Sequence, residues 1–401
     1  MLWSLLAVFV NYLMNFLITP YVTENIGVEA YGFVGLSATF ISYMDIFTVG
    51  FNSFAGRFVS VAYHQGDYEK ANRYYSSTIL ADFILSLLLL AAGTAMIIRL
   101  DQFFRIPSVL KQDVRLLFLL VLLRHLLTVL RTAFDTAAFI AERLDLAEKR
   151  QSAAYLLQGT VLLVMCLFLP PHVWYIGLAN AVSAVYLLFA GWRLCRRLTP
   201  QLHFEKRWAS RSAAWEIAAT GLWTSLNNLG NVLNSGLDLL ITNLMLSAAA
   251  VGEISIAKNL AAICYTLVVK ISGSFRPRLL LYFAEGKTGR LVEMYRLAMK
   301  ITGSFCGLVI CVFYVCGYDF LQLWIPDQNI DFIFAASMIV LLGDIATGVV
   351  NPLYYVFTLT KRLKIPCLIT ILMGCANVVS MYLLIKGTSL GAYQGCFMNY
   401  E

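Results

Sequence analysis

A row of charged and polar residues runs through one strongly apolar stretch of the chain. Arg124, Thr128, Arg131 and Asp135 are spaced i, i+4, i+7 and i+11, which places them on one face of an α-helix. A guanidinium donates two parallel hydrogen bonds to a phosphate, so this row could line a cavity that binds a diphosphate. The alternative is internal pairing, because Asp135 is one turn from Arg131 and could neutralise it.

A second row consists mainly of carboxamides. Its members share one predicted helix face and are Asn227, Asn231, Asn234 and Asp238. Carboxamides both donate and accept hydrogen bonds, which suits sugar hydroxyls, although they also join one membrane helix to another. Asn11 and Asn15 occupy a corresponding depth in the first apolar stretch, so both sets are candidates for lining one cavity.

Isolated ionisable residues inside the apolar stretches indicate possible ion coupling. An acid within a membrane helix could bind a proton or a sodium ion, or could pair with a base such as Arg131 or Lys258. The candidate acids are Asp45, Asp135, Asp238 and Asp344. Lys258 is also a candidate for the cavity. The histidines and cysteines lack metal-ligand spacing, so we expect no metal site and no cofactor apart from a coupling H⁺ or Na⁺.

Three arginines at the ends of apolar stretches form a separate group, which consists of Arg57, Arg276 and Arg278. They would anchor their helices by the positive-inside rule. Alternatively, they would make the first contact with a pyrophosphate at the cytoplasmic entrance.

The elements that must position these residues are membrane helices. Of the 401 residues, 60% are hydrophobic and only 13% are charged, against about 25% in a soluble chain. This composition excludes both intrinsic disorder and a single soluble core. The apolar stretches are about 20 residues long, enough to span a bilayer as helices. The predicted helices cover roughly 2–21, 32–62, 75–98, 115–141, 153–170, 174–192, 214–246, 253–276, 293–317, 332–358 and 366–386.

The two halves of the chain match when one is shifted by 220 residues. Gly32 then falls on Gly252, Gly66 on Gly286, and the predicted helices superpose in order and length. We therefore predict an all-α, polytopic membrane protein with about eleven transmembrane helices. The predicted domains are a six-helix half over 1–200, a basic cytoplasmic connection over 201–213, and a second half over 214–401. A twelfth helix is expected over 394–412, so the second half would lack its last helix.

Several segments carry a family resemblance. They are NFLITPYVTENIGVEAYGFVGL (15–36), NSFAGRFVSVAYHQGDYEKANRYYSS (52–77), GLDLLITNLMLSAAAVGEISIAKNL (236–260) and FRPRLLLYFAEGK (275–287). The chain resembles the polysaccharide flippases of the multidrug/oligosaccharidyl-lipid/polysaccharide (MOP) exporter superfamily. The resemblance implies a MATE-like transporter fold that works by alternating access. It also implies a cargo, a polyprenyl-diphosphate-linked oligosaccharide that is moved to the outer face of a bacterial plasma membrane.

Two other functions are weighed against this one. A drug/cation antiporter of the same superfamily would need an acidic cavity, whereas the acids and bases here are mixed. A membrane glycosyltransferase or polysaccharide polymerase would need a catalytic acid outside, yet most predicted outside loops are short, so we expect no enzyme. Expected partners are the lipid-linked glycan, the bilayer, and polymerase and glycosyltransferases of one pathway. We expect a monomer that binds no nucleic acid.

Lysine and arginine in the connections give a prediction of orientation, since cytoplasmic loops carry the excess of these residues. They place the N-terminus in the cytoplasm, residue 205 inside and residue 328 outside. In a background whose nine native cysteines are replaced, a membrane-impermeant thiol reagent applied to intact cells should label Gln328→Cys and not Glu205→Cys. Labelling of Glu205→Cys alone would reverse the orientation.

Overall fold

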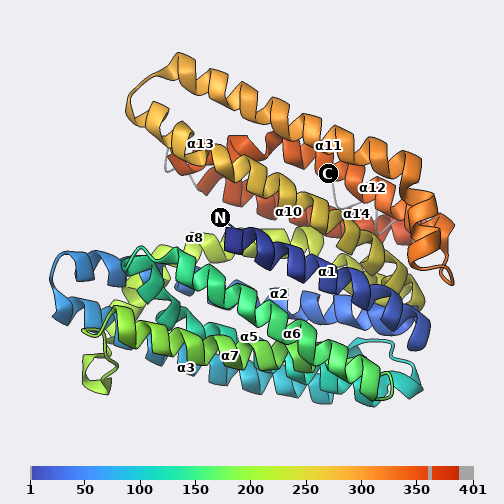
Figure 1. Cartoon of the computed structure of the whole chain (residues 1–401), viewed down its shortest axis with the longest axis horizontal. Coiled ribbons are helices and arrows are strands. Elements are labelled where there is room, and N and C mark those ends of the chain that lie inside the picture. Colours follow the sequence, from blue (N-terminus) through green and yellow to red (C-terminus); the bar gives the residue numbers. More distant parts are fainter. Residues whose placement is uncertain (1, 360–363, 388–401) are drawn as a thin grey trace. The chain divides into compact units, whose positions relative to one another are not determined.

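The computed structural model describes residues 2–359 and 364–387, and it is helical almost throughout these ranges (Figure 1). The helices are α1 (Leu2–Asn25), α2 (Val28–His64), α3 (Tyr68–Ile98), α4 (Leu100–Phe103), α5 (Lys111–Ile140), α6 (Leu144–Phe168), α7 (Trp174–Leu198), α8 (Arg211–Ser235), α9 (Asp238–Met245), α10 (Ala248–Ala284), α11 (Thr288–Trp324), α12 (Ile330–Val350), α13 (Tyr354–Leu359) and α14 (Lys364–Gly387). Short 3₁₀ turns occupy η1 (Ser108–Leu110), η2 (Lys206–Trp208) and η3 (Asn351–Leu353).

The prediction of an all-α, multi-pass membrane protein is confirmed. Within the described residues, nine helical stretches are long and apolar enough to cross a membrane. Every predicted helix corresponds to an observed one, but two of them are interrupted. The stretch predicted as 214–246 breaks after Ser235, and that predicted as 332–358 breaks at η3, where Pro352 has no backbone N–H to continue the helix. The predicted twelfth helix lies outside the described residues.

The chain forms two compact units, which we call unit 1 and unit 2. Unit 1 comprises residues 1–26 and 36–229, and unit 2 comprises residues 27–35 and 230–401. In unit 1, α7 packs along α5 and α6, α6 packs on α1, and α3 packs on α5. In unit 2, the helices α10, α11 and α12 pack against one another. The beginning of α2 thus belongs to unit 2 and the remainder of that helix to unit 1.

Local geometry repeats at the 220-residue spacing. After α2, Gly66 has φ +77°, the N–H of residue 66 donates to O of 63, and that of 67 donates to O of 62. After α10, Gly286 has φ +66°, with the same bonds from 286 to 283 and from 287 to 282. Positive φ favours glycine because it has no Cβ, so this αL turn explains the matching glycines.

A second match lies inside unit 2, where the first turns of α2 cross α10. A Cβ on Gly32 would lie 2.8 Å from the Gly252 nitrogen and 3.1 Å from the Ala248 oxygen. Reciprocally, a Cβ on Gly252 would clash with the Val28 oxygen. Because Val28 and Ala248 are also 220 residues apart, the contact is symmetric about a local pseudo-twofold axis. Close backbone approach requires glycine at both positions.

The segment that joins α7 to α8 is hydrogen-bonded to the first turns of α3. Asn72 donates through Nδ2 to the Gln201 oxygen at 3.0 Å and accepts from the His203 N–H at 2.9 Å. Ser76 accepts from the Glu205 N–H at 3.2 Å, and Ser77 accepts from the Ser210 N–H at 2.9 Å. Side chains of α3 therefore replace the helical partners that this irregular segment lacks.

These bonds predict an effect on stability. Asn72 is 4% exposed, and Asn72→Leu would remove its hydrogen bonds to the Gln201 oxygen and from the His203 N–H, each worth about 0.5–1.5 kcal/mol. We expect a lower melting temperature of the purified protein and faster proteolysis within 199–210. Ser212→Ala is the matched control, because its hydroxyl is exposed and Arg73 also donates to Ser210. Equal melting of the two variants would contradict the prediction.

Candidate functional site

The row on α5 contains an ion-pair cluster. Arg131 Nε lies 2.8 Å from Asp135 Oδ2, and Arg150 of α6 places Nη2 3.6 Å from Asp135 Oδ1. The internal pairing that the spacing allowed is therefore present, with a second arginine that the sequence did not suggest. Two guanidinium groups share one carboxylate, so the cluster keeps a surplus positive charge.

Arg124 differs from Arg131 although both lie in the same row. Its side chain is exposed in unit 1 and, among the described residues, makes no ion pair within 4 Å. Thr128, one turn further along α5, donates its hydroxyl to the Arg124 backbone oxygen at 2.9 Å. The guanidinium donors of Arg124 are therefore available to an anion.

Asp45 pairs with a residue other than those the sequence suggested. His125 Nδ1 lies 3.7 Å from Asp45 Oδ1, so Arg131, which belongs to the same unit, is not the partner. The Thr48 hydroxyl donates to the same carboxylate oxygen at 3.4 Å. His125 is 6% exposed. The predicted partner was wrong because the packing of these helices brings this imidazole of α5, and not Arg131, to Asp45 on α2.

In unit 2 the break between α8 and α9 brings several predicted residues together. The Ser235 oxygen accepts from Lys258 Nζ at 2.9 Å, and Lys258 also pairs with Asp238. The Asn234 oxygen accepts from Asn377 Nδ2 at 2.6 Å. These side chains satisfy carbonyls that lose their helical N–H partners at the break. The prediction of one continuous face from Asn227 to Asp238 is therefore wrong.

The remaining predicted residues are more dispersed. Asn231 is exposed, and its backbone oxygen accepts from the Ser235 hydroxyl at 3.0 Å, while Asn227 is half-buried. Asn15 is half-buried, and its oxygen accepts from Thr19 at 2.8 Å. The side chains of Asn11, Asp344 and Arg276 lie outside the described part of the structure, and Arg278 is exposed.

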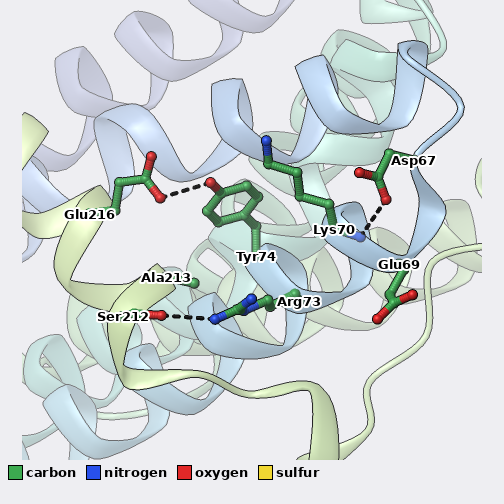
Figure 2. Close-up of a pocket in the computed structure, with 8 residues that line it drawn as sticks. All are labelled: Asp67, Glu69, Lys70, Arg73, Tyr74, Ser212, Ala213 and Glu216. Atoms are coloured by element: carbon green, nitrogen blue, oxygen red, sulfur yellow. Dashed lines mark hydrogen bonds between the residues drawn. The ribbon is translucent and has the colours of Figure 1, made fainter.

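Arg57 lines a cavity of about 410 Å³ in unit 1 that the sequence did not reveal. The cavity adjoins a second one of about 370 Å³, and both share Lys70, Tyr74 and Glu216. Figure 2 shows Tyr74 among the lining residues, with its hydroxyl donating to Glu216 Oε2 at 2.8 Å, and Arg73 donating to the Ser212 hydroxyl at 2.9 Å. Arg57 and Lys70 make no ion pair with any described residue. The sequence marked Arg57 as a helix anchor or a residue of the cytoplasmic entrance, whereas Lys70 and Arg73 contributed only to the prediction of topology.

Comparison with known proteins identifies a family model and a relative that match this chain. A family model described as "Polysaccharide biosynthesis protein" matches residues 1–280. The uncharacterized membrane protein EpsK of Bacillus subtilis (strain 168) is 31% identical over 396 residues, covering 97% of this chain and 76% of that protein.

Solved structures show the same fold. An inward-facing multidrug resistance MATE family transporter of the MOP superfamily matches with a TM-score of 0.77 at 15% identity, covering 99% of this chain and 93% of that one. The MATE multidrug transporter DinF-BH matches with a TM-score of 0.69 at 15% identity, covering 99% of this chain and 90% of that one. A MOP superfamily transporter from Pyrococcus furiosus matches with a TM-score of 0.59 at 15% identity, covering 99% of this chain and 90% of that one. The binding pocket of that transporter has a reverse polarity that suggests a different function.

The fold therefore defines a multi-pass membrane protein of the MATE-like class that the resemblance implied. Within that class, the chain belongs to the polysaccharide biosynthesis protein family.

The contacts at the break give a prediction for unit 2. Lys258→Ala removes the cation that faces Asp238, which is 4% exposed, and removes a donor from the Ser235 oxygen. Breaking a buried pair costs about 3–5 kcal/mol, so we expect a clear drop in melting temperature. Asp238→Asn added to Lys258→Ala should recover part of the loss. Lys270→Ala, on an exposed position of the same helix, is the control and should melt like the unmodified protein.

Proposed function

We propose that this protein is a flippase that moves a polyprenyl-diphosphate-linked oligosaccharide from the cytoplasmic to the outer face of a bacterial plasma membrane. Membership of the polysaccharide biosynthesis protein family supports this cargo class. The observation that carries the proposal is Arg124, a guanidinium within a membrane span that has no carboxylate oxygen within 4 Å among the described residues. Such a charge is costly in hydrocarbon, and a phosphate would compensate it.

The charges near Arg124 add to this argument. Arg131 and Arg150 share the single carboxylate of Asp135, so this part of unit 1 has a positive surplus. A diphosphate head group would be attracted there, while the polyprenyl tail stays in lipid. In the Pyrococcus furiosus transporter a reversed pocket polarity suggests a different function, which supports charge as the variable feature of the fold.

The cavity at Arg57 is proposed as the loading side. With the N-terminus in the cytoplasm, the end of α2 and the start of α3 would face the cytoplasm, where the lipid-linked glycan is assembled. Arg57 and Lys70 offer cations, and Phe54, Phe58 and Tyr74 offer apolar surface. We place Arg276 and Arg278 at the same side as the repeat-related residues of the second half. Glycosyltransferases and a polymerase of the pathway would supply and consume the cargo.

A drug/cation antiporter is the second candidate. It would present unpaired acids to a cationic drug. Asp45 instead faces His125, Asp135 faces two arginines, and Asp238 faces Lys258. These three acids are therefore engaged by bases, which disfavours their use as a binding site for a cationic drug. A glycosyltransferase or polymerase would be recognised by elongated glycan product when the purified protein is incubated with lipid-linked donor.

The test is transport by purified protein in liposomes. The probe is a fluorescent polyprenyl diphosphate disaccharide whose outer-leaflet fraction is measured by chemical quenching. Arg124→Ala should abolish flipping with unchanged melting temperature. Arg124→Lys should retain part of the flipping activity, because lysine keeps the charge but cannot donate two parallel hydrogen bonds to a phosphate. Arg143→Ala is the control, since Arg143 is exposed and, among the described residues, forms an ion pair with Asp145 alone.

Arg131 should behave differently from Arg124. Arg131→Ala should lower both transport and stability, because Asp135 loses its closer partner. Normal transport by Arg124→Ala would remove the main support for the proposal. Transport of an organic cation by the unmodified protein, without flipping of the lipid probe, would favour the antiporter.

A further inference from the structure

The end of α7 carries three arginines that no acid neutralises. Arg193, Arg196 and Arg197 lie in the last two turns of this helix, and all three are exposed. Among the residues that the structure describes, no carboxylate oxygen lies within 4 Å of their guanidinium groups. The chain has no acidic residue between Glu148 and Glu205, and Glu205 is engaged by two bases of its own segment. This helix end therefore keeps three positive charges.

A tryptophan directly before these arginines contacts one of them. Arg196 Cζ lies 4.4 Å from the centroid of the Trp192 ring. The N–H groups of a guanidinium lie in its own plane, so an arginine stacked on an indole still directs its donors away from the ring. The contact thus holds Arg196 in place and leaves its donors available to an anion.

An apolar stripe leads along α7 to this tryptophan. Val185, Phe189, Trp192 and Arg196 are spaced i, i+4, i+7 and i+11, so they share one face of the helix. Val185 is 39% exposed and Phe189 is 63% exposed, so unit 1 leaves this face uncovered. The order of side chains along the face is aliphatic and aromatic hydrocarbon, then indole, then guanidinium.

The length of α7 places these groups at defined depths in a membrane. The helix is one of the stretches that are long and apolar enough to span a bilayer. The part from Trp174 to Trp192 is about 27 Å long at the α-helical rise. This length is close to the roughly 30 Å of a bilayer core, and indoles favour the two boundaries of that core. The arginines from Arg193 onward therefore lie at the level of the lipid phosphates.

We propose that the end of α7 is a binding site for an anionic phospholipid of the surrounding membrane. The phosphate accepts hydrogen bonds from the three arginines, the acyl chains lie along Val185 and Phe189, and the glycerol lies beside Trp192. The apolar, aromatic and basic groups follow one another along the helix as the acyl, glycerol and phosphate groups do in such a lipid. Charge selects the lipid, because a zwitterionic head group adds a cation next to the arginines. This binding is independent of transport.

Fluorescence quenching by brominated lipid tests the site. The purified protein is placed in phosphatidylcholine nanodiscs that contain a rising fraction of brominated phosphatidylglycerol or of brominated phosphatidylcholine. The signal of Trp192 is the difference between the unmodified protein and Trp192→Phe. Half-quenching should need a several-fold smaller fraction of the anionic lipid. Equal quenching by the two lipids would overturn the proposal.

The arginines should carry this preference. The triple variant Arg193→Gln, Arg196→Gln and Arg197→Gln should lose it, at about fivefold in lipid affinity for each arginine removed. The corresponding triple lysine variant should keep most of the preference, because its charge is unchanged. An undiminished preference in the glutamine variant would show that the arginines only stabilise the carbonyl end of the helix and would overturn the proposal.

The matched control removes the same charge from α11. Arg290→Gln, Arg296→Gln and Lys300→Gln change three exposed residues of unit 2 and should leave the quenching of Trp192 unchanged. Salt gives a test that needs no variant, because ions screen exposed charges. The preference of the unmodified protein should fall as sodium chloride is raised, and a preference that does not respond to salt would contradict a site selected by charge.

Crosslinking distinguishes a lipid from a second copy of the chain on the same face. Phe189→Cys is introduced into a background whose nine native cysteines are replaced, and the protein is oxidised in liposomes that contain phosphatidylglycerol. We expect the chain to stay monomeric on a non-reducing gel. A disulfide-linked dimer through residue 189 would assign the face to a second copy and overturn the proposal.

Discussion

The absence of water inside a bilayer is the constraint on which this structure depends. Backbone and side-chain polar groups in a membrane span must find partners within the protein, because an unpaired group there costs several kcal/mol. The break between α8 and α9 shows how this is met. The carbonyl oxygens of Asn234 and Ser235 lose their helical partners, and Asn377 and Lys258 donate to them from neighbouring helices. The backbone carbonyls at this interruption are thereby hydrogen-bonded although the regular helix stops.

The same requirement explains the irregular segment between α7 and α8. Its N–H and carbonyl groups are satisfied by Asn72, Ser76 and Ser77, which project from the first turns of α3. The segment is thus part of unit 1 rather than a free linker. Glu216 on α8 accepts from Tyr74, so the start of α8 is fixed to the same turns, and both residues line the cavity at Arg57.

Charge pairing separates residues that hold the fold from residues that can act on a cargo. Removal of Lys258 leaves the buried carboxylate of Asp238 without this cation, and removal of Arg131 leaves Asp135 with Arg150 alone. Arg124 stands apart from these ion pairs, as do the three exposed arginines at the end of α7. The proposed function uses Arg124, and the proposed lipid site uses the arginines of α7.

The sequence alone determined the class of the protein, its helices and its repeat. Apolar stretches of bilayer length specify membrane helices regardless of their neighbours, and the 220-residue spacing reappears in the Gly66 and Gly286 turns and in the Gly32 and Gly252 crossing. These properties are local or periodic, so a single chain displays them. Spacing also placed Asp135 one turn from Arg131, which is the geometry of the observed pair.

Only the tertiary structure decided which polar groups meet across helices. Spacing along α5 could not reveal that His125 faces Asp45 or that Arg150 reaches Asp135, because each pair joins two helices. The break after Ser235 depends on donors supplied by α10 and α14. The sequence of this segment keeps the helical period of 3.6 residues, so it predicted one continuous helix. The exposed stripe of α7 drew no attention in the sequence for the same reason: which face of an apolar helix stays uncovered is decided by the helices packed around it and not by its own segment.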